Sequence, residues 1–149
     1  MSQLADIEKA IITKLTGLTV DGEAVFNTLT GATGPVSVTL LQALLRERMP
    51  AAYVVFISEK LAPETDPTDL GPRFSLLLAD RALRQTANPR EGDPPSPGVF
   101  TMIDQTRALL DSYVPDGLSV TLTPIAQNSL LADARQAVVQ LTYQARSSP

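Results

Sequence analysis

The chain has 149 residues, of which 44% are hydrophobic, and its mean hydropathy is close to zero. These values indicate one globular domain and exclude a disordered chain. Twelve basic and 16 acidic residues give a net charge of −4 and a pI near 4.7, which disfavours nonspecific binding to a phosphate backbone. Cysteine and histidine are both absent, which excludes disulfides, thiolate zinc sites and most familiar hydrolase chemistry.

The first predicted element is an amphipathic helix near the N-terminus, capped by Ser2 and ended by Gly17. Its apolar stripe consists of Leu4, Ile7, Ile11, Leu15 and Leu18. Asp6 and Lys14 interrupt this apolar stretch, so it does not have the pattern of a signal peptide or a membrane span. We therefore expect a soluble protein that is made in the cytosol.

A strand over residues 23–29 and a second helix are predicted next. The strand follows from a weakly alternating run of residues that suit strands. The helix follows a Gly34-Pro35 turn, and Ser37 is available as its cap. Its leucines at 40, 41, 44 and 45 lie along one side, and Pro50 stops the run.

Two continuous apolar runs predict central strands that are covered on both faces. They are "AAYVVFISEKL", beginning at Ala51, and "RFSLLLADRAL", beginning at Arg73. The connection between them is acidic, rich in proline and long for a hairpin, so we expect a long loop at residues 58–72.

The segment "PREGDPPSPGVF", residues 89–100, combines a proline-rich loop with the start of a third helix. We expect a long loop at residues 85–97, Ser96 as the helix cap and Pro97 at the first helical position, where its missing N–H costs nothing. The apolar stripe of this helix is Val99, Met102, Ile103, Thr106, Leu109, Leu110 and Tyr113.

The chain closes with two predicted strands, "LSVTLTP" at residues 118–124 and "QAVVQLTYQAR" at residues 136–146. The second alternates cleanly, which predicts one apolar and one polar face. The apolar face holds Ala137, Val139, Leu141, Tyr143 and Ala145. Only Val138 departs from the polar set on the other face, so we expect that face to meet water or a polar partner.

The order of these elements predicts an α+β fold in one domain that spans residues 1–149. We expect a mixed or antiparallel sheet of about four to five strands, covered by three amphipathic helices. No change in composition divides the chain, so the proline-rich stretch at residues 85–97 is interpreted as a loop within the domain rather than a linker.

Two groups of charged side chains are the candidate binding residues. Arg81, Arg84 and Arg90 could form an anion clamp, or they could pair with Glu91, Asp93 or a neighbouring subunit. Glu64, Asp66 and Asp69 lie in one predicted loop, but Pro67 interrupts the regular ligand spacing of a calcium loop. We interpret both groups as contacts with a neighbouring subunit or another protein partner, and expect no catalytic, cofactor or metal site.

One long segment carries a resemblance to a known family. "RFSLLLADRALRQTANPREGDPPSPGVFTMIDQTRALL" resembles the small tail proteins of Mu-like phages and prophages, in which an arginine-bearing strand end precedes a variable loop and "GVF" opens a helix that ends in "RALL". The matching positions are Arg81, Arg84, Arg90, Gly98, Val99, Phe100, Arg107, Leu109 and Leu110. The N-terminal helix and the last strand are also similar.

The resemblance implies a tail terminator, also called a tail completion protein. Such a protein is a virion structural component, not an enzyme, and forms a hexameric ring that caps the tail tube, ends tail growth and joins the tail to the head. The implied partners are further copies of the chain, the tail tube protein, a neck or head-completion protein and, in a contractile tail, the sheath protein. The implied location is the tail–neck junction of the virion, without a membrane and without a cofactor.

The net charge suits a ring through which DNA passes without specific binding. Six copies at −4 would carry about −24, and a negatively charged lumen would let DNA slide. Two other functions remain open at this point. One is a head-completion or neck adaptor protein, and the other is a small anion-binding protein or enzyme that uses the arginine cluster.

Overall fold

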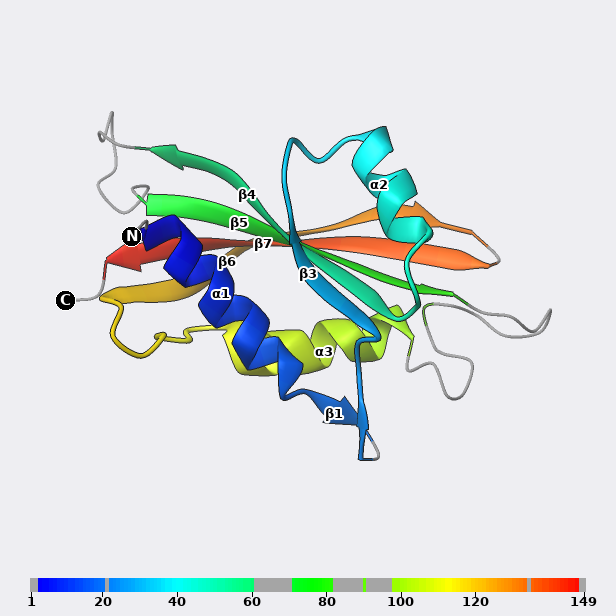
Figure 1. The fold of residues 1–149 in the computed structure, drawn as a ribbon, viewed down its shortest axis with the longest axis horizontal. Coiled ribbons are helices and arrows are strands. Elements are labelled where there is room, and N and C mark those ends of the chain that lie inside the picture. Colours follow the sequence, from blue (N-terminus) through cyan, green and yellow to red (C-terminus); the bar gives the residue numbers. More distant parts are fainter. Residues whose placement is uncertain are drawn as a thin grey trace.

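A mixed five-stranded sheet forms the centre of the protein, in the strand order β3-β4-β5-β7-β6 (Figure 1). The computed structural model describes residues 3–20, 22–60, 71–81, 90, 98–133 and 135–147. The strands are β3 (Thr28–Ala32), β4 (Ala51–Lys60), β5 (Gly71–Arg81), β6 (Val120–Ala132) and β7 (Gln136–Ser147). β3 runs parallel to β4 and every other pair is antiparallel, so the predicted α+β class with one mixed sheet is confirmed.

Three helices cover the two faces of this sheet unequally. The longer two, α1 (Gln3–Thr16) and α3 (Val99–Leu110), lie together on one face, and the short α2 (Val38–Leu45) lies on the other (Figure 1). The main core lies between the sheet and the first two helices, and a smaller core lies under α2. Among the described residues, helix α2 covers only part of this second face.

The apolar stripe predicted for the first helix faces the main core, where Ile7, Ile11 and Leu15 are buried. The apolar face predicted for the last strand is also confirmed, because its five residues belong to the same core. The predicted cap of α2 is confirmed as well: the Leu40 N–H donates to Ser37 Oγ at 3.3 Å. Local sequence pattern and burial agree in these elements.

The strand predicted over residues 23–29 is divided in the structure. Glu23–Ala24 is β2, which forms a small hairpin with β1 (Thr19–Val20), and the sheet strand β3 begins only at Thr28. The division falls where the Asn27 N–H donates to the Pro50 carbonyl at 2.8 Å, across to the start of β4. A contact distant in sequence thus sets where the sheet strand begins.

The start predicted for the third helix is wrong. α3 begins at Val99, and its N-cap is Gly98, with φ of 86°. That conformation favours glycine, and it separates the helix from Pro97, which therefore cannot hold the first helical position. Ser96 and Pro97 themselves lie outside the described residues.

β5 begins two residues earlier than predicted and is buried over residues 74–80, whereas β4 ends at Lys60, one residue before the end of its predicted run. Lys60 pairs with Gly71, so strand structure occupies both ends of the predicted 58–72 loop, and residues 61–70 lie outside the described part of the chain. Residues 51–55 of β4 are buried, but residues 56–59 are exposed, so coverage on both faces is confirmed only for the first half of that strand. Residues 85–89 and 91–97 of the second predicted loop also lie outside the described part.

Candidate assembly surface

The arginines predicted to cluster lie in different places where the structure describes them. Arg81 ends β5, and its guanidinium donates to the carbonyl of Leu45 at 2.7 Å, at the C-terminus of α2. Arg90 lies beside α3, with its guanidinium carbon 5.9 Å from the centre of the Phe100 ring. Because α2 and α3 cover opposite faces of the sheet, these contacts give no support to a clamp that joins the two arginines.

Six of the predicted interface residues lie outside the described part of the chain, and their role stays a prediction. They are Glu64, Asp66, Asp69, Arg84, Glu91 and Asp93. Arg81 has a structural role at the end of α2. A cation at a helix C-terminus forms hydrogen bonds with carbonyls that lack a partner within the helix and interacts favourably with the helix dipole.

The edge strand β6 is an uncharged and partly exposed surface. It is 13 residues long, "VTLTPIAQNSLLA", and contains no charged residue. It pairs with β7 on one side and forms the end of the sheet on the other. Residues 125–129 are exposed. Edge strands are usually protected by charged side chains, because free backbone N–H and C=O groups can pair with another strand.

Two irregularities divide β6 into segments. The register against β7 shifts between Pro124 and Ala126 and again between Ser129 and Leu131. Proline is tolerated at such an edge position, which explains why the strand continues beyond the end predicted from the sequence. The regular exposed segment between the shifts is Ala126–Ser129.

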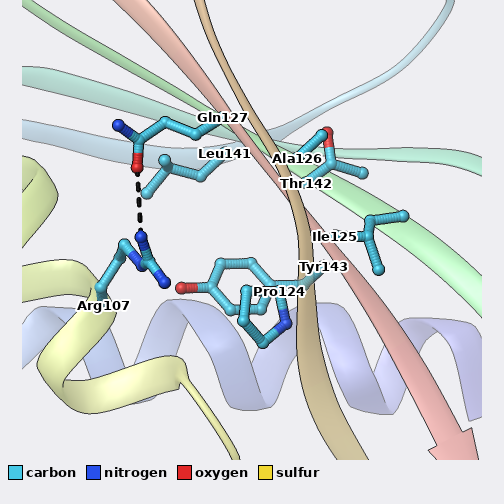
Figure 2. A pocket seen from close by; sticks show the side chains of 8 residues that line it. All are labelled: Arg107, Pro124, Ile125, Ala126, Gln127, Leu141, Thr142 and Tyr143. Carbon is cyan, nitrogen blue, oxygen red and sulfur yellow. Dashed lines mark hydrogen bonds between the residues drawn. The ribbon is translucent and has the colours of Figure 1, made fainter.

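A groove, here called the α3–β6 groove, runs between α3 and this edge strand. It consists of two hollows of about 190 and about 200 Å³, and both are lined by Gln127. Arg107, Leu141 and Tyr143 line the first (Figure 2), and Arg90 and Phe100 line the second. Phe100 is half exposed in this position. The groove exists because α3 packs on β5 and β7 and stops short of the edge strand.

A hydrogen-bonded network holds one end of this groove. The Tyr143 hydroxyl donates to Asp111 Oδ1 at 2.6 Å, and Arg107 donates to Asp111 Oδ2 through Nε at 3.1 Å. Arg107 also reaches Gln127 Oε1 of β6 at 3.5 Å (Figure 2). The network ties the end of α3 to β7 and to the edge strand.

The electrostatics of the network favour a protonated tyrosine. Burial raises the pKa of the Tyr143 phenol strongly, and its hydrogen bond to Asp111 raises the pKa further. The hydrogen bond to Asp111 likewise raises the pKa of the Arg107 guanidinium. A phenol and a guanidinium that share one carboxylate form a positioning contact, and neither group is prepared for proton transfer near neutral pH.

Removing the tyrosine hydroxyl should change how stability depends on alkaline pH. Because the folded pKa of Tyr143 lies above the value near 10 of an unfolded tyrosine, its contribution is present below about pH 10 and is lost as pH rises. Tyr143→Phe should lower the free energy of unfolding by about 1–2 kcal/mol at pH 7. Above about pH 10, its stability should fall less steeply than that of the wild type, by up to about 1.4 kcal/mol per pH unit.

Urea unfolding between pH 7 and pH 11 measures this difference. Tyr53 also has a raised pKa, from burial and from Glu47, but it is present in both proteins and cancels in the comparison. Parallel pH profiles for the two proteins would show that the Tyr143 hydroxyl does not keep its proton in the folded state.

Sequence reasoning predicted only the first part of the edge strand, as residues 118–124, and missed the network. Arg107 and Asp111 are spaced as an i,i+4 pair, and they form a salt bridge of 3.0 Å. This contact of the network could have been predicted from the sequence. Tyr143 was assigned only to the apolar face. Its hydroxyl partner depends on α3 packing over β7, which one sequence does not show.

None of the helices that the structure describes has the length and apolar character needed to cross a membrane. Within the described residues, acidic side chains do not gather in groups of three or more that could hold a metal ion.

Comparison with known proteins gives a family for the chain. A search of the curated proteins found no match. The family model described as "Bacteriophage Mu, Gp37" matches residues 3–147 and so covers the helices, the sheet and the edge strand together. This agrees with the resemblance to Mu-like phage proteins, and the chain belongs to the bacteriophage Mu Gp37 family.

Proposed function

We propose that this chain is a virion structural protein, the tail terminator of a Mu-like phage. Copies of it form a hexameric ring on the end of the tail tube, stop tube growth and join the tail to the neck at the head. DNA passes through the ring without specific binding. The observation that carries the proposal is the family match over residues 3–147.

The uncharged edge strand supports an assembly function. β6 carries no charge over its 13 residues and is exposed over residues 125–129, which is a hazard for a protein that works alone, because such an edge invites pairing with other chains. The hazard disappears when the edge is covered in an assembly. The α3–β6 groove beside it supplies apolar and hydrogen-bonding surface for the same contact.

The contacts of the two described arginines do not favour the alternative of a small anion-binding protein. It relied on an arginine cluster, yet Arg81 is engaged at the end of α2 and Arg90 lies over Phe100 on the other face of the sheet. A neck adaptor remains the competing assembly function, because an exposed sheet edge suits either kind of ring.

Mixing the purified protein with polymerising tail tube protein of the same phage tests the proposal. Negative-stain images should show shorter tubes with extra density at one end, and tube length should fall as the concentration of this protein rises. Tube protein alone and tube protein with bovine serum albumin are the controls.

Two results would contradict the terminator function. Tubes of unchanged length with bare ends would exclude capping. A ring that ignores tubes and binds only a portal or head preparation would assign the protein to the neck instead.

A further inference from the structure

We infer that β6 of one copy pairs with β3 of the next copy, so that the sheet continues from subunit to subunit around the ring. The inference rests on the proposed ring and adds which surfaces close it. The occupant of the free β6 edge is therefore a second copy of this chain.

The first argument is that this chain supplies two complementary edges. The five-stranded sheet ends at β6 on one side and at β3 on the other. Neither strand contains a charged residue, since β3 is "TLTGA". Among the described residues no further strand pairs with either outer strand, and contact between two different edges of one sheet is head-to-tail, the type of contact that generates rings.

The second argument is strand direction. β3 and β4 are parallel, and β4, β5, β7 and β6 alternate, so β3 runs opposite to β6 within one copy. In a sheet that repeats copies in the same orientation, β6 meets an antiparallel β3 from its neighbour. Antiparallel pairing is slightly more stable per residue than parallel pairing.

The third argument is length and exposure. The regular exposed segment of β6 is Ala126–Ser129, four residues between two register shifts, and β3 has five residues. Thr30, at the centre of β3, is exposed. The two segments therefore match in size, and the shifts at both ends of the β6 segment limit where the neighbour can pair.

Side-chain direction gives a specific test of this pairing. Thr30 is paired with Tyr53, and Asn128 with Gln140, which places both on the α2 face of the sheet. Ser129 is paired with Val139 and points to the opposite face. Because the chain has no cysteine, introduced pairs can be read without background.

The experiment is oxidative cross-linking of double-cysteine variants in the presence of tail tubes. T30C combined with A126C or N128C should form disulfide-linked ladders that extend to six copies, since cysteines on one face of adjacent strands come within bonding range. T30C combined with Q127C or S129C is the matched control, and it should cross-link at least tenfold less because the side chains point to opposite faces. Mass measurement of the unoxidised samples reports ring formation separately.

The two measurements separate the two proposals. The β6–β3 pairing would be overturned if every variant forms rings or caps tubes, but the same-face pairs cross-link no more than the opposite-face pairs. The terminator function would then still stand. Monomers that neither cap tubes nor cross-link would overturn both.

Discussion

Ala126→Lys combined with Asn128→Lys should abolish ring formation and tube capping while the monomer stays folded. Both residues are exposed in the isolated chain, so their replacement costs the monomer little. In the proposed β6–β3 contact, two ammonium groups would have to lose water without partners. A penalty of roughly 3 kcal/mol per interface corresponds to an association constant about a hundredfold lower.

The sign of the added charge makes this result specific. Each copy changes from −4 to −2, so the total charge of six copies changes from −24 to −12 and repulsion between subunits decreases. Loss of the ring could not then be attributed to net charge. Thr39→Lys with Ala108→Lys adds the same charge at exposed positions on α2 and α3, and this control should still assemble.

Light scattering and tube-capping images compare the two double variants, and circular dichroism confirms the fold of each. Normal capping by the variant with lysines at 126 and 128 would show that this edge is free in the assembled tail.

Asp80→Ala should be the most destabilising single substitution that we propose. The side chain is completely buried at the end of β5, where Oδ1 accepts from the Arg81 N–H at 2.8 Å and Oδ2 accepts from the Gly98 N–H at 2.7 Å. Alanine would leave the buried Gly98 N–H without this acceptor at the start of α3. We expect a loss of about 3–4 kcal/mol in the free energy of unfolding.

Thermal and urea unfolding measure this loss, which corresponds to a fall of roughly 6–16 °C in Tm for a chain of this size. Asp80→Asn is the control, because its single carbonyl oxygen can replace one of the two acceptors, and it should lose roughly half as much. A loss below about 1 kcal/mol for alanine would mean that the carboxylate does not anchor the helix start.

The elements predicted correctly are those in which local pattern and burial coincide. The stripe of α1, the cap of α2 and the alternation of β7 follow from residue spacing alone. The correct fold class follows from their order. The start of α3 was missed because Gly98 adopts a positive φ that Asp80 stabilises from a distant strand, and the sequence favoured the neighbouring serine and proline.

The candidate surface was harder to predict than the fold. The interface residues predicted from the sequence are all charged, whereas the edge strand β6 in the structure contains no charged residue. Pro124 ended the predicted strand, and only the pairing with β7 shows that β6 continues to Ala132. That β6 and β3 are the two ends of the sheet depends on strand order, which spacing along one chain does not contain.

An image reconstruction of the capped end of a tail tube tests the central claim most directly. We expect a six-fold ring of this chain, about 95 kDa for six copies of 15.9 kDa, with the β6 edge of every copy covered by its neighbour. A tube end without this chain, or a ring in which the β6 edge faces solvent, would contradict the account.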